Sequence, residues 1–155
     1  MSQMPLLHHA SLALSLAARA WRTPVCFGTN GVIEQPDGTV ILVRHRYMPG
    51  LCFPGGGVDA GEPPQDAVLR ELKEEVGLLH AGAVELFGLY TRKVGWTTNV
   101  IALYRVSGAE IRFRPSLEIA EIACANPHAP PPDTSPATRR RLAELTGAAP
   151  VSPYW

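Results

Sequence analysis

The sequence has no apolar run long enough to cross a membrane. A transmembrane helix needs about 18 to 20 consecutive apolar residues, and every apolar segment here is shorter. The sequence also has no internal repeat. Its 155 residues are 46% hydrophobic, which is enough for one sizeable core. We therefore expect a single domain over residues 1–155, without a membrane partner.

Cysteine is scarce. Cys26, Cys52 and Cys124 are odd in number and widely spaced, and no two of them have the spacing of a metal-binding pair. Secreted domains of this size often carry an even set of cysteines that form disulfides. The three cysteines are therefore expected to be free thiols in a reducing compartment, which favours the cytoplasm.

The N-terminal segment has some features of a secretion signal. Residues 6–20 are largely apolar and end in Ala18-Arg19-Ala20, which is similar to a signal-peptidase site. However, residues 1–7 carry no basic side chain, and His8 and His9 interrupt the apolar stretch. We predict instead an N-terminal helix within residues 1–21 that packs on the domain.

An excess of positive charge is also missing. The formal net charge is zero, so the chain has no overall basic field that would attract a polynucleotide. A small molecule is the expected partner, and the oligomeric state is open, with a homodimer as one option. Arginine outnumbers lysine twelve to two. This bias fits phosphate recognition and genome composition equally well.

One segment is rich in acidic residues and follows a run of glycines. Pro63 and Pro64 suit a first helical turn, residues 67–76 are good helix formers, and Gly77 suits the position after a helix. At about 100° per residue, the three glutamates of this helix share one arc, and four apolar residues occupy the adjoining arc. These are Glu71, Glu74 and Glu75, and Val68, Leu69, Leu72 and Val76.

The three carboxylates repel one another unless a cation lies between them. Taken alone, such a run fits a solvated acidic face as well as a metal site. Arg70 lies one turn before Glu74, so an ion pair between them would partly neutralise the cluster. The glycines at 55–57 allow close backbone approach to a metal or phosphate, or they form a plain turn.

The remaining pattern predicts alternating strands and helices. A hairpin is expected from strands at 25–33 and 39–46 with a turn at 35–38, because Pro36, Asp37 and Gly38 favour a turn. Residues 126–155 are predicted to form a Pro-rich connection, then a helix that begins at Ser135 and Pro136, and then a tail without an assigned structure. Further strands are expected at 83–91, 99–106 and 118–123.

Residues 56–78 together resemble the signature of the Nudix hydrolase superfamily. The pattern is Gly, five residues, Glu, seven residues, then Arg-Glu-aliphatic-x-Glu-Glu-x-Gly-aliphatic. Every specified position is matched, by Gly56, Glu62, Arg70, Glu71, Leu72, Glu74, Glu75, Gly77 and Leu78. The resemblance implies an α/β fold, an α/β/α sandwich with a mixed sheet, in which the signature forms a loop, a helix and a loop.

The resemblance also implies a reaction. Family members hydrolyse the diphosphate bridge of a nucleoside diphosphate linked to another group, such as a nucleoside triphosphate, a nucleotide sugar or ADP-ribose. Glu71, Glu74, Glu75 and the Gly56 carbonyl match metal ligands, and hard oxygen donors suit Mg²⁺ or Mn²⁺. A non-hydrolytic nucleotide sensor that keeps the fold is the alternative.

Supporting and catalytic roles follow from the same resemblance. Glu62 and Arg70 match supporting positions, with Arg70 close to the reacting groups. The general base is Glu71 within the signature or a glutamate outside it. Glu118 is the first outside choice, because it lies at an expected loop-to-strand junction where it would also reach a second metal. Glu121 is the weaker choice.

Substrate-binding residues are less well marked. Strand alternation places Arg44 and Arg46 on one face, where they would reach a phosphate or lie in solvent. Gly55 and Gly57 would contact the phosphates through their backbone. Trp96 would stack on a base or serve in packing. His45 lies on the opposite strand face without a recognisable partner.

Overall fold

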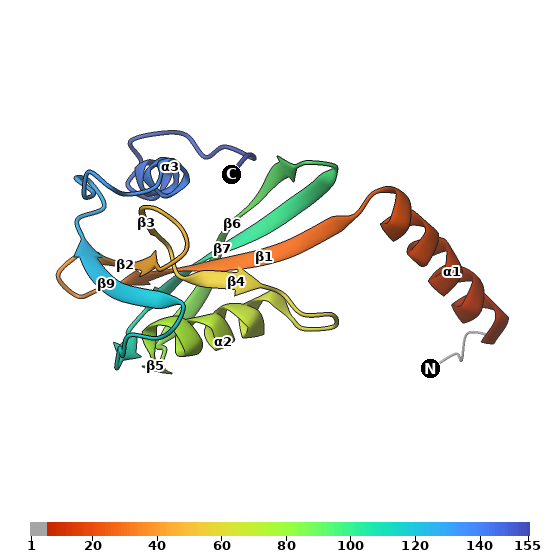
Figure 1. Ribbon diagram of the computed structural model, residues 1–155, viewed down its shortest axis with the longest axis horizontal. Coiled ribbons are helices and arrows are strands. Elements are labelled where there is room, and N and C mark those ends of the chain that lie inside the picture. The colour runs from red at the N-terminus through yellow and green to blue at the C-terminus, as the bar shows by residue number, and fades with distance from the viewer. Residues whose placement is uncertain (1–5) are drawn as a thin grey trace.

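The computed structural model describes residues 6–155 and places a mixed β-sheet between two helices (Figure 1). The helices are α1 (Leu6–Arg22), α2 (Pro64–Val76) and α3 (Pro136–Leu145). The strands are β1 (Val25–Glu34), β2 (Val40–His45), β3 (Leu51–Cys52), β4 (Gly55–Gly57), β5 (Leu78–His80), β6 (Ala83–Val94), β7 (Thr97–Ser107), β8 (Glu110–Ile111) and β9 (Ile119–Ala125). The predicted strands, hairpin turn and second and third helices are all present, within a few residues of the expected limits.

Strand β1 is central to the main sheet, whose order is β3-β2-β1-β7-β6. It pairs in parallel with β7 from Val25–Thr98 to Ile33–Val106. Its other edge is divided, because residues 28–30 pair with β4 and residues 33–34 pair with β2, both antiparallel. Strand β9 adds to β2, and β5 and β8 form a separate two-stranded sheet. The glycine loop is therefore built directly onto the central strand.

The helix α2 covers one face of the sheet, as Figure 1 shows below the strands. Its buried apolar side chains include Val68, Leu72 and Val76, and they pack against Ile33 of β1 and Ala102 of β7. Burial of each such side chain stabilises the fold by roughly 1.5–3 kcal/mol. The apolar arc expected from the sequence thus holds α2 on the sheet and fixes the direction of the adjoining acidic arc.

The other face is covered by α3 and the tail. Leu142 of α3 packs with Tyr90, Leu103 and Phe53 in a second core. Ser135 caps α3, because its hydroxyl accepts a hydrogen bond from the Thr138 N–H at 3.2 Å, as the Ser-Pro pair predicts. The sheet is thus covered on both faces, and the expected α/β/α sandwich is confirmed.

A buried polar network attaches the tail. The Arg141 side chain is 1% exposed and donates to Glu144, and its guanidinium lies 4.3 Å from the centre of the Tyr90 ring. Glu144 also accepts hydrogen bonds from the Tyr90 hydroxyl at 3.0 Å and the Ser152 N–H at 3.0 Å. Additional hydrogen bonds help to offset the desolvation of a buried charge pair. Here the tail supplies one through the Ser152 N–H, while the Arg141 Nε has no partner within residues 6–155.

Replacing Tyr90 with phenylalanine is expected to destabilise the protein by about 1–2 kcal/mol. The ring stays, but Glu144 loses one hydrogen bond to a charged, buried acceptor. Urea unfolding measures the difference. Tyr104→Phe is the matched control, because the Tyr104 hydroxyl makes no hydrogen bond within the described residues 6–155. Equal losses in the two variants would mean that the Glu144 contact is unimportant.

The first helix differs from expectation. A helix is present at Leu6–Arg22, and residues 1–5 of the predicted segment lie outside the described residues. It does not pack on the domain as predicted: Ala10 and residues 12–22 are exposed, Trp21 by 83%, and α1 points away from the sheet (Figure 1). Leu12, Leu14 and Leu16 are exposed, and α2 and α3 already cover both faces of the sheet. Within residues 6–155, no helix combines the length and the hydrophobicity needed to cross a membrane.

Candidate active site

The glycine loop β4 lies against β1 through an unusually close backbone contact. Gly55 has φ +148°, and a Cβ there would collide with the Thr29 carbonyl oxygen. The Asn30 side-chain amide donates to the Phe53 carbonyl at 3.1 Å, and the Gly31 N–H donates to Pro54 at 2.9 Å. Only glycine tolerates this conformation and contact, so the loop position is fixed by β1.

The helix α2 begins directly after this loop. Pro63 and Pro64 occupy its first positions, and Gly77 ends it with φ 68°, donating its N–H to the Leu72 carbonyl. Prolines suit the first turn because the first helical N–H groups have no partner in the helix. These end signals, which are visible in the sequence, fix where the acidic residues lie relative to the loop.

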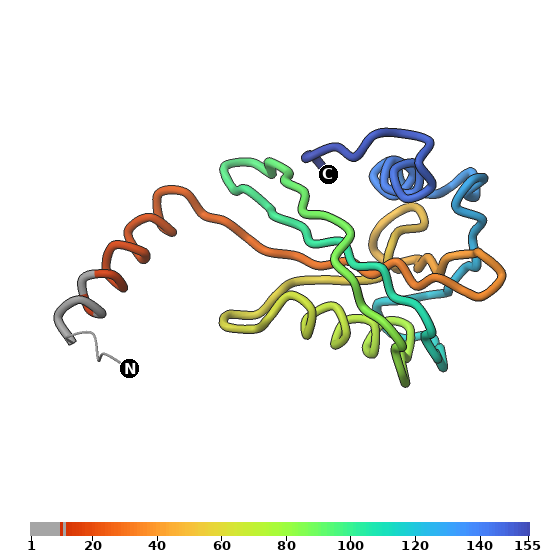
Figure 2. Tube along the Cα trace, turned by 180° about the vertical axis from the view of Figure 1, so that it is seen from behind, coloured from red at the N-terminus to blue at the C-terminus, as the bar shows by residue number. Residues whose placement is uncertain are grey.

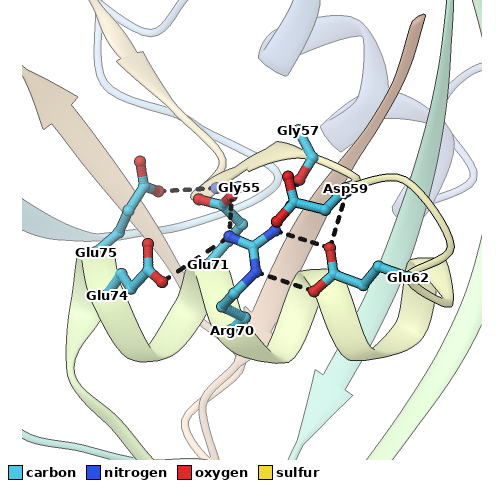
Figure 3. Close-up of polar contacts among 8 residues, drawn as sticks. All are labelled: Gly55, Gly57, Asp59, Glu62, Arg70, Glu71, Glu74 and Glu75. Carbon is cyan, nitrogen blue, oxygen red and sulfur yellow. Dashed lines mark hydrogen bonds and ion pairs between the residues drawn. The ribbon is translucent and has the colours of Figure 1, made fainter.

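Arg70 ties the loop to the helix (Figure 3). Its Nε and Nη2 donate to the two Glu62 carboxylate oxygens, each at 2.9 Å. Its Nη1 donates to Glu71 Oε1 at 2.7 Å, and Nη2 also donates to the Gly57 carbonyl at 2.9 Å. The expected ion pair with Glu74 is the longest contact, at 3.9 Å. Because Glu62 faces the guanidinium as a two-pronged acceptor, Arg70 holds Glu62 and Glu71 more firmly than Glu74.

The Glu62–Arg70 pair predicts a specific acid sensitivity. The hydrogen bond from Arg70 lowers the pKa of Glu62 from its usual 4.5 to about 2. A group whose pKa is lower in the folded state stabilises that state above its unfolded pKa, and this contribution disappears as the pH falls. The stability difference between the parent and Glu62→Gln should therefore shrink as the pH falls from about 4.5 to about 2. Thermal unfolding across this range measures it, and a difference independent of pH would contradict the prediction.

Glu75 lies on the buried side of the acidic arc. It is 6% exposed, and its carboxylate accepts the Gly55 N–H at 2.8 Å. Burial raises the pKa of Glu75 to about 7, the Gly55 hydrogen bond opposes this shift, and repulsion from Glu71, Glu118 and Glu74 adds to it. Four carboxylates thus act on one another here, and a cation would relieve the repulsion.

His45 is the nearest basic group to Glu75. Its Nε2 lies 3.7 Å from Glu75 Oε1, and both side chains are buried. Burial lowers the pKa of His45, although the charge of Glu118 opposes the shift. A neutral imidazole does not compensate the carboxylates. This contact was not predicted, because His45 comes from β2 and Glu75 from α2, which are distant in the sequence.

Glu71 lies against Gly56. A Cβ on Gly56 would lie 2.5 Å from the Glu71 Cδ and 2.6 Å from each carboxylate oxygen. The absence of a side chain at Gly56 is therefore what brings this carboxylate to the loop backbone. The neighbouring donors are carboxylate and carbonyl oxygens, which are the ligands that Mg²⁺ and Mn²⁺ prefer, so the residues fit such an ion. The side chains in residues 6–155 include no group of three His, Cys, Asp or Glu already arranged to hold a metal ion. Glu71 is paired with Arg70, and Glu74 is 61% exposed.

The predicted residues outside the signature fall into two groups. Glu118 lies just before β9, and its charge acts on both Glu75 and His45, which places it beside the acidic cluster. Arg44 instead donates to Glu121 at 2.7 Å and to Asp133, and the Arg46 side chain donates to the Ser116 carbonyl at 2.8 Å. Strand β2 ends at His45, and its pairing with β9 shifts register between Arg44 and His45, so Arg46 lies beyond the strand. Each arginine is held by at least one side-chain hydrogen bond to the protein.

The loop, the helix and the sheet behind them match a known protein family. The model of the NUDIX domain family matches residues 27–146. The chain belongs to the NUDIX domain family. The match begins within β1 and ends just after α3, so α1 and the tail lie outside it.

Two curated relatives of this Nudix chain are named for different substrates. One is an ADP-ribose pyrophosphatase from Methanocaldococcus jannaschii, 32% identical over 99 residues, which are 59% of this chain and 57% of the relative. Another is an RNA pyrophosphohydrolase from Caulobacter vibrioides, 47% identical over 70 residues, which are 43% of this chain and 37% of the relative. The matched part of the chain corresponds to little more than half of the first relative and less of the second.

The Nudix fold is also found in solved structures. A MutT NUDIX hydrolase from Burkholderia pseudomallei superposes with a TM-score of 0.69 at 23% identity, over 78% of this chain and 98% of that one. At this identity the likeness establishes the fold and not the substrate. The expectation of a Nudix fold from residues 56–78 is thus confirmed over most of the chain.

The Nudix loop borders a large cavity of about 920 Å³. Gly55, Gly56 and Gly57 line it, together with His45 and with residues of β1, β6, β7, α3 and the tail. Sequence reasoning missed Asn30, Arg92, Asn99, Arg140 and Trp155, which all line it. Trp96, the aromatic residue considered for stacking, is 76% exposed and lies outside the lining. Neither Arg44 nor Arg46 lines the cavity.

Proposed function

We propose that this Nudix chain is a divalent-metal-dependent hydrolase that cleaves the diphosphate bridge of a nucleoside diphosphate linked to another group, by attack of water on phosphorus. The observation that carries the proposal is the position of Glu71 against Gly56 and of Glu75 on the Gly55 N–H, in a glycine loop that borders a cavity. The charges of Glu74 and Glu118 also act on Glu75. Arg70 compensates part of this negative charge, and the carboxylates that remain repel one another unless a cation lies between them.

The metal ligands in this proposal are Glu71, Glu74, Glu75, Glu118 and the Gly56 carbonyl, with Mg²⁺ or Mn²⁺ as the ion. When bound, such an ion screens phosphate charge and lowers the pKa of a coordinated water. Gly55 and Gly57 contribute by lacking side chains, so that a diphosphate can approach the backbone. Amide donation from Gly55 is not available in this arrangement, because its N–H is bonded to Glu75.

The surrounding residues position the reacting groups. Arg70 fixes the Glu71 carboxylate, and Glu62 fixes Arg70. The general base is Glu71, in α2, or Glu118, just before β9. Glu118→Gln separates the two roles: a large loss of kcat with an unchanged metal requirement indicates the base, whereas a raised metal requirement indicates a ligand.

The proposed substrate is a small nucleotide-type molecule. The net charge of zero argues against a polynucleotide, whereas the relative named RNA pyrophosphohydrolase keeps triphosphorylated RNA in the test. Cytoplasmic location is proposed from the three cysteines, which are all free thiols. A homodimer remains one proposed state of assembly.

A substrate panel tests the proposed activity. The protein is incubated with Mg²⁺ or Mn²⁺ and nucleoside triphosphates, nucleotide sugars, ADP-ribose, dinucleoside polyphosphates or RNA with a 5′-triphosphate, and the products are identified. Cleavage within the diphosphate bridge that requires the ion is the expected result. Binding without cleavage of any of these compounds would favour a nucleotide sensor, which we consider the alternative function.

A further inference from the structure

The cavity lining carries positive charge near α3 and the tail. Two arginines line the cavity, Arg92 from β6 and Arg140 from α3. Among the lining residues that the structure describes, none is aspartate or glutamate. The carboxylates of the Nudix signature come instead from α2, which lies on the opposite face of the sheet from α3 (Figure 1). The cavity is therefore lined in one part by Gly55–Gly57, next to the acidic cluster, and in another part by two arginines.

Both arginines lack an acidic partner. Arg44, Arg70, Arg105 and Arg141 each form an ion pair with a carboxylate. Within residues 6–155, neither Arg92 nor Arg140 has an ion pair within 4 Å or a side-chain hydrogen bond to the protein. An arginine that lines a cavity with its five donors unused is suited to bind an anion, and phosphate matches its forked geometry.

The tail brings an aromatic ring to the same cavity. The Trp155 N–H donates to the Thr91 carbonyl at 3.0 Å, so the tail lies along β6 next to Arg92. The Trp155 ring packs edge-on against Tyr90 at 5.5 Å and also lines the cavity. Figure 2 shows the tail passing from α3 to the end of the β6–β7 hairpin. Trp155 thus joins the strand that carries Arg92 to the helix that carries Arg140.

We propose that Arg92 and Arg140 bind a phosphate monoester that the substrate carries in addition to its diphosphate bridge. This inference rests on the proposed function, because the bridge itself must lie at Gly55–Gly57 for the glutamates to act on it. Phe27, Val94 and Ile101 add apolar surface to the same lining. The preferred substrates are then nucleoside diphosphate derivatives with a further phosphate on the ribose or on the linked group.

Binding without metal tests the phosphate subsite apart from hydrolysis. Isothermal titration compares adenosine 3′,5′-bisphosphate with adenosine 5′-monophosphate, and the guanosine pair likewise, on the full chain. The bisphosphates should bind at least about tenfold more tightly, and Arg92→Gln/Arg140→Gln should remove this preference. Arg114→Gln is the control, because Arg114 is exposed, unpaired in the described structure and outside the cavity lining. It should leave the preference unchanged.

Turnover then distinguishes the two proposals. Coenzyme A and its 3′-dephospho form are a matched pair of diphosphates, and so are ADP-ribose and its 2′-phosphate. The double variant should lose at least about tenfold in kcat/KM for the phosphorylated member of a cleaved pair and less than about twofold for the other. Equal losses for both members, or no loss, would overturn the subsite. A binding preference that the double variant loses supports the subsite even if no diphosphate is cleaved, and the absence of cleavage counts against the hydrolase alone.

Discussion

Glu75→Gln is expected to lower kcat/KM for any cleaved diphosphate by about 10²–10³-fold while leaving the fold intact. The glutamine oxygen can still accept the Gly55 N–H, so the loop keeps its contact with α2. What is lost is the negative charge that the proposed metal requires. Steady-state kinetics over a range of Mg²⁺ concentrations separates a weaker metal site from a misplaced one.

Stability provides a second readout for the same variant. Burial and its acidic neighbours raise the pKa of Glu75 to about 7. Above that pH, the buried charge destabilises the folded state of the metal-free parent. The raised folded-state pKa means that Glu75 stabilises the fold below its usual 4.5, and that this contribution is lost as the pH rises through 7. Metal-free Glu75→Gln should thus be at least as stable as the parent at pH 8.

Matched controls complete this test. Glu110→Gln removes an exposed carboxylate from β8, away from the signature, and should leave both activity and metal requirement unchanged. Glu74→Gln should also reduce activity, because Glu74 belongs to the proposed ligand set. Full activity in the Glu74→Gln/Glu75→Gln double variant would be incompatible with the metal site.

Alanine substitutions in the glycine loop are expected to give three different results at three consecutive positions. Gly55→Ala should destabilise the protein by about 3 kcal/mol or more, because the added Cβ meets the Thr29 backbone at a positive φ. Gly57→Ala should change stability by less than about 0.5 kcal/mol, since nothing lies within 4 Å of its Cβ. Gly57 is thus the matched control for Gly55.

Gly56→Ala should mainly affect activity. Its Cβ meets the end of a flexible side chain, Glu71, and not the backbone. That carboxylate can swing away at the cost of its hydrogen bond to Arg70, about 1 kcal/mol, but it then leaves the loop. We expect a loss of at least about tenfold in kcat/KM. Thermal unfolding and kinetics on all three variants measure the series. A Gly56→Ala variant with full activity would mean that the position of Glu71 at the loop is unimportant.

The local elements of the site could be predicted from the sequence, because their signals are local. Prolines at the start of α2 and glycine at its end fix the helix, and residue spacing fixes its apolar and acidic arcs. The contacts of Arg70 were only half predicted: its partner Glu62 matched a supporting position, but the geometry of the pair depends on how the loop folds back. The burial of Glu75 was not predicted, because residue spacing places all three glutamates in one arc and does not distinguish Glu75 from the other two.

Features that depend on contacts between distant segments could not be predicted from the sequence. Trp155 and Trp96 are each isolated aromatics, and only the attachment of the tail through Arg141 and Glu144 decides which one lines the cavity. Arg44 and Arg140 likewise carry the same guanidinium group. Whether a carboxylate neutralises it depends on Asp133 and Glu121 in the first case and on an acid-free wall in the second. The residue type alone therefore did not show which of the two arginines has a carboxylate partner.

The parallel pairing of β1 with β7 has a consequence for the order of folding. Residues 25–33 must wait for residues 98–106 before this pairing forms, and pairing between such distant segments is slow. During synthesis, the glycine loop and α2 emerge from the ribosome before β7, when only their local contacts can form. The strand that positions Gly55 is then still held on one side only. We therefore expect α2 to acquire helical structure early, and binding competence to appear last, after β7, β9, α3 and the tail are in place.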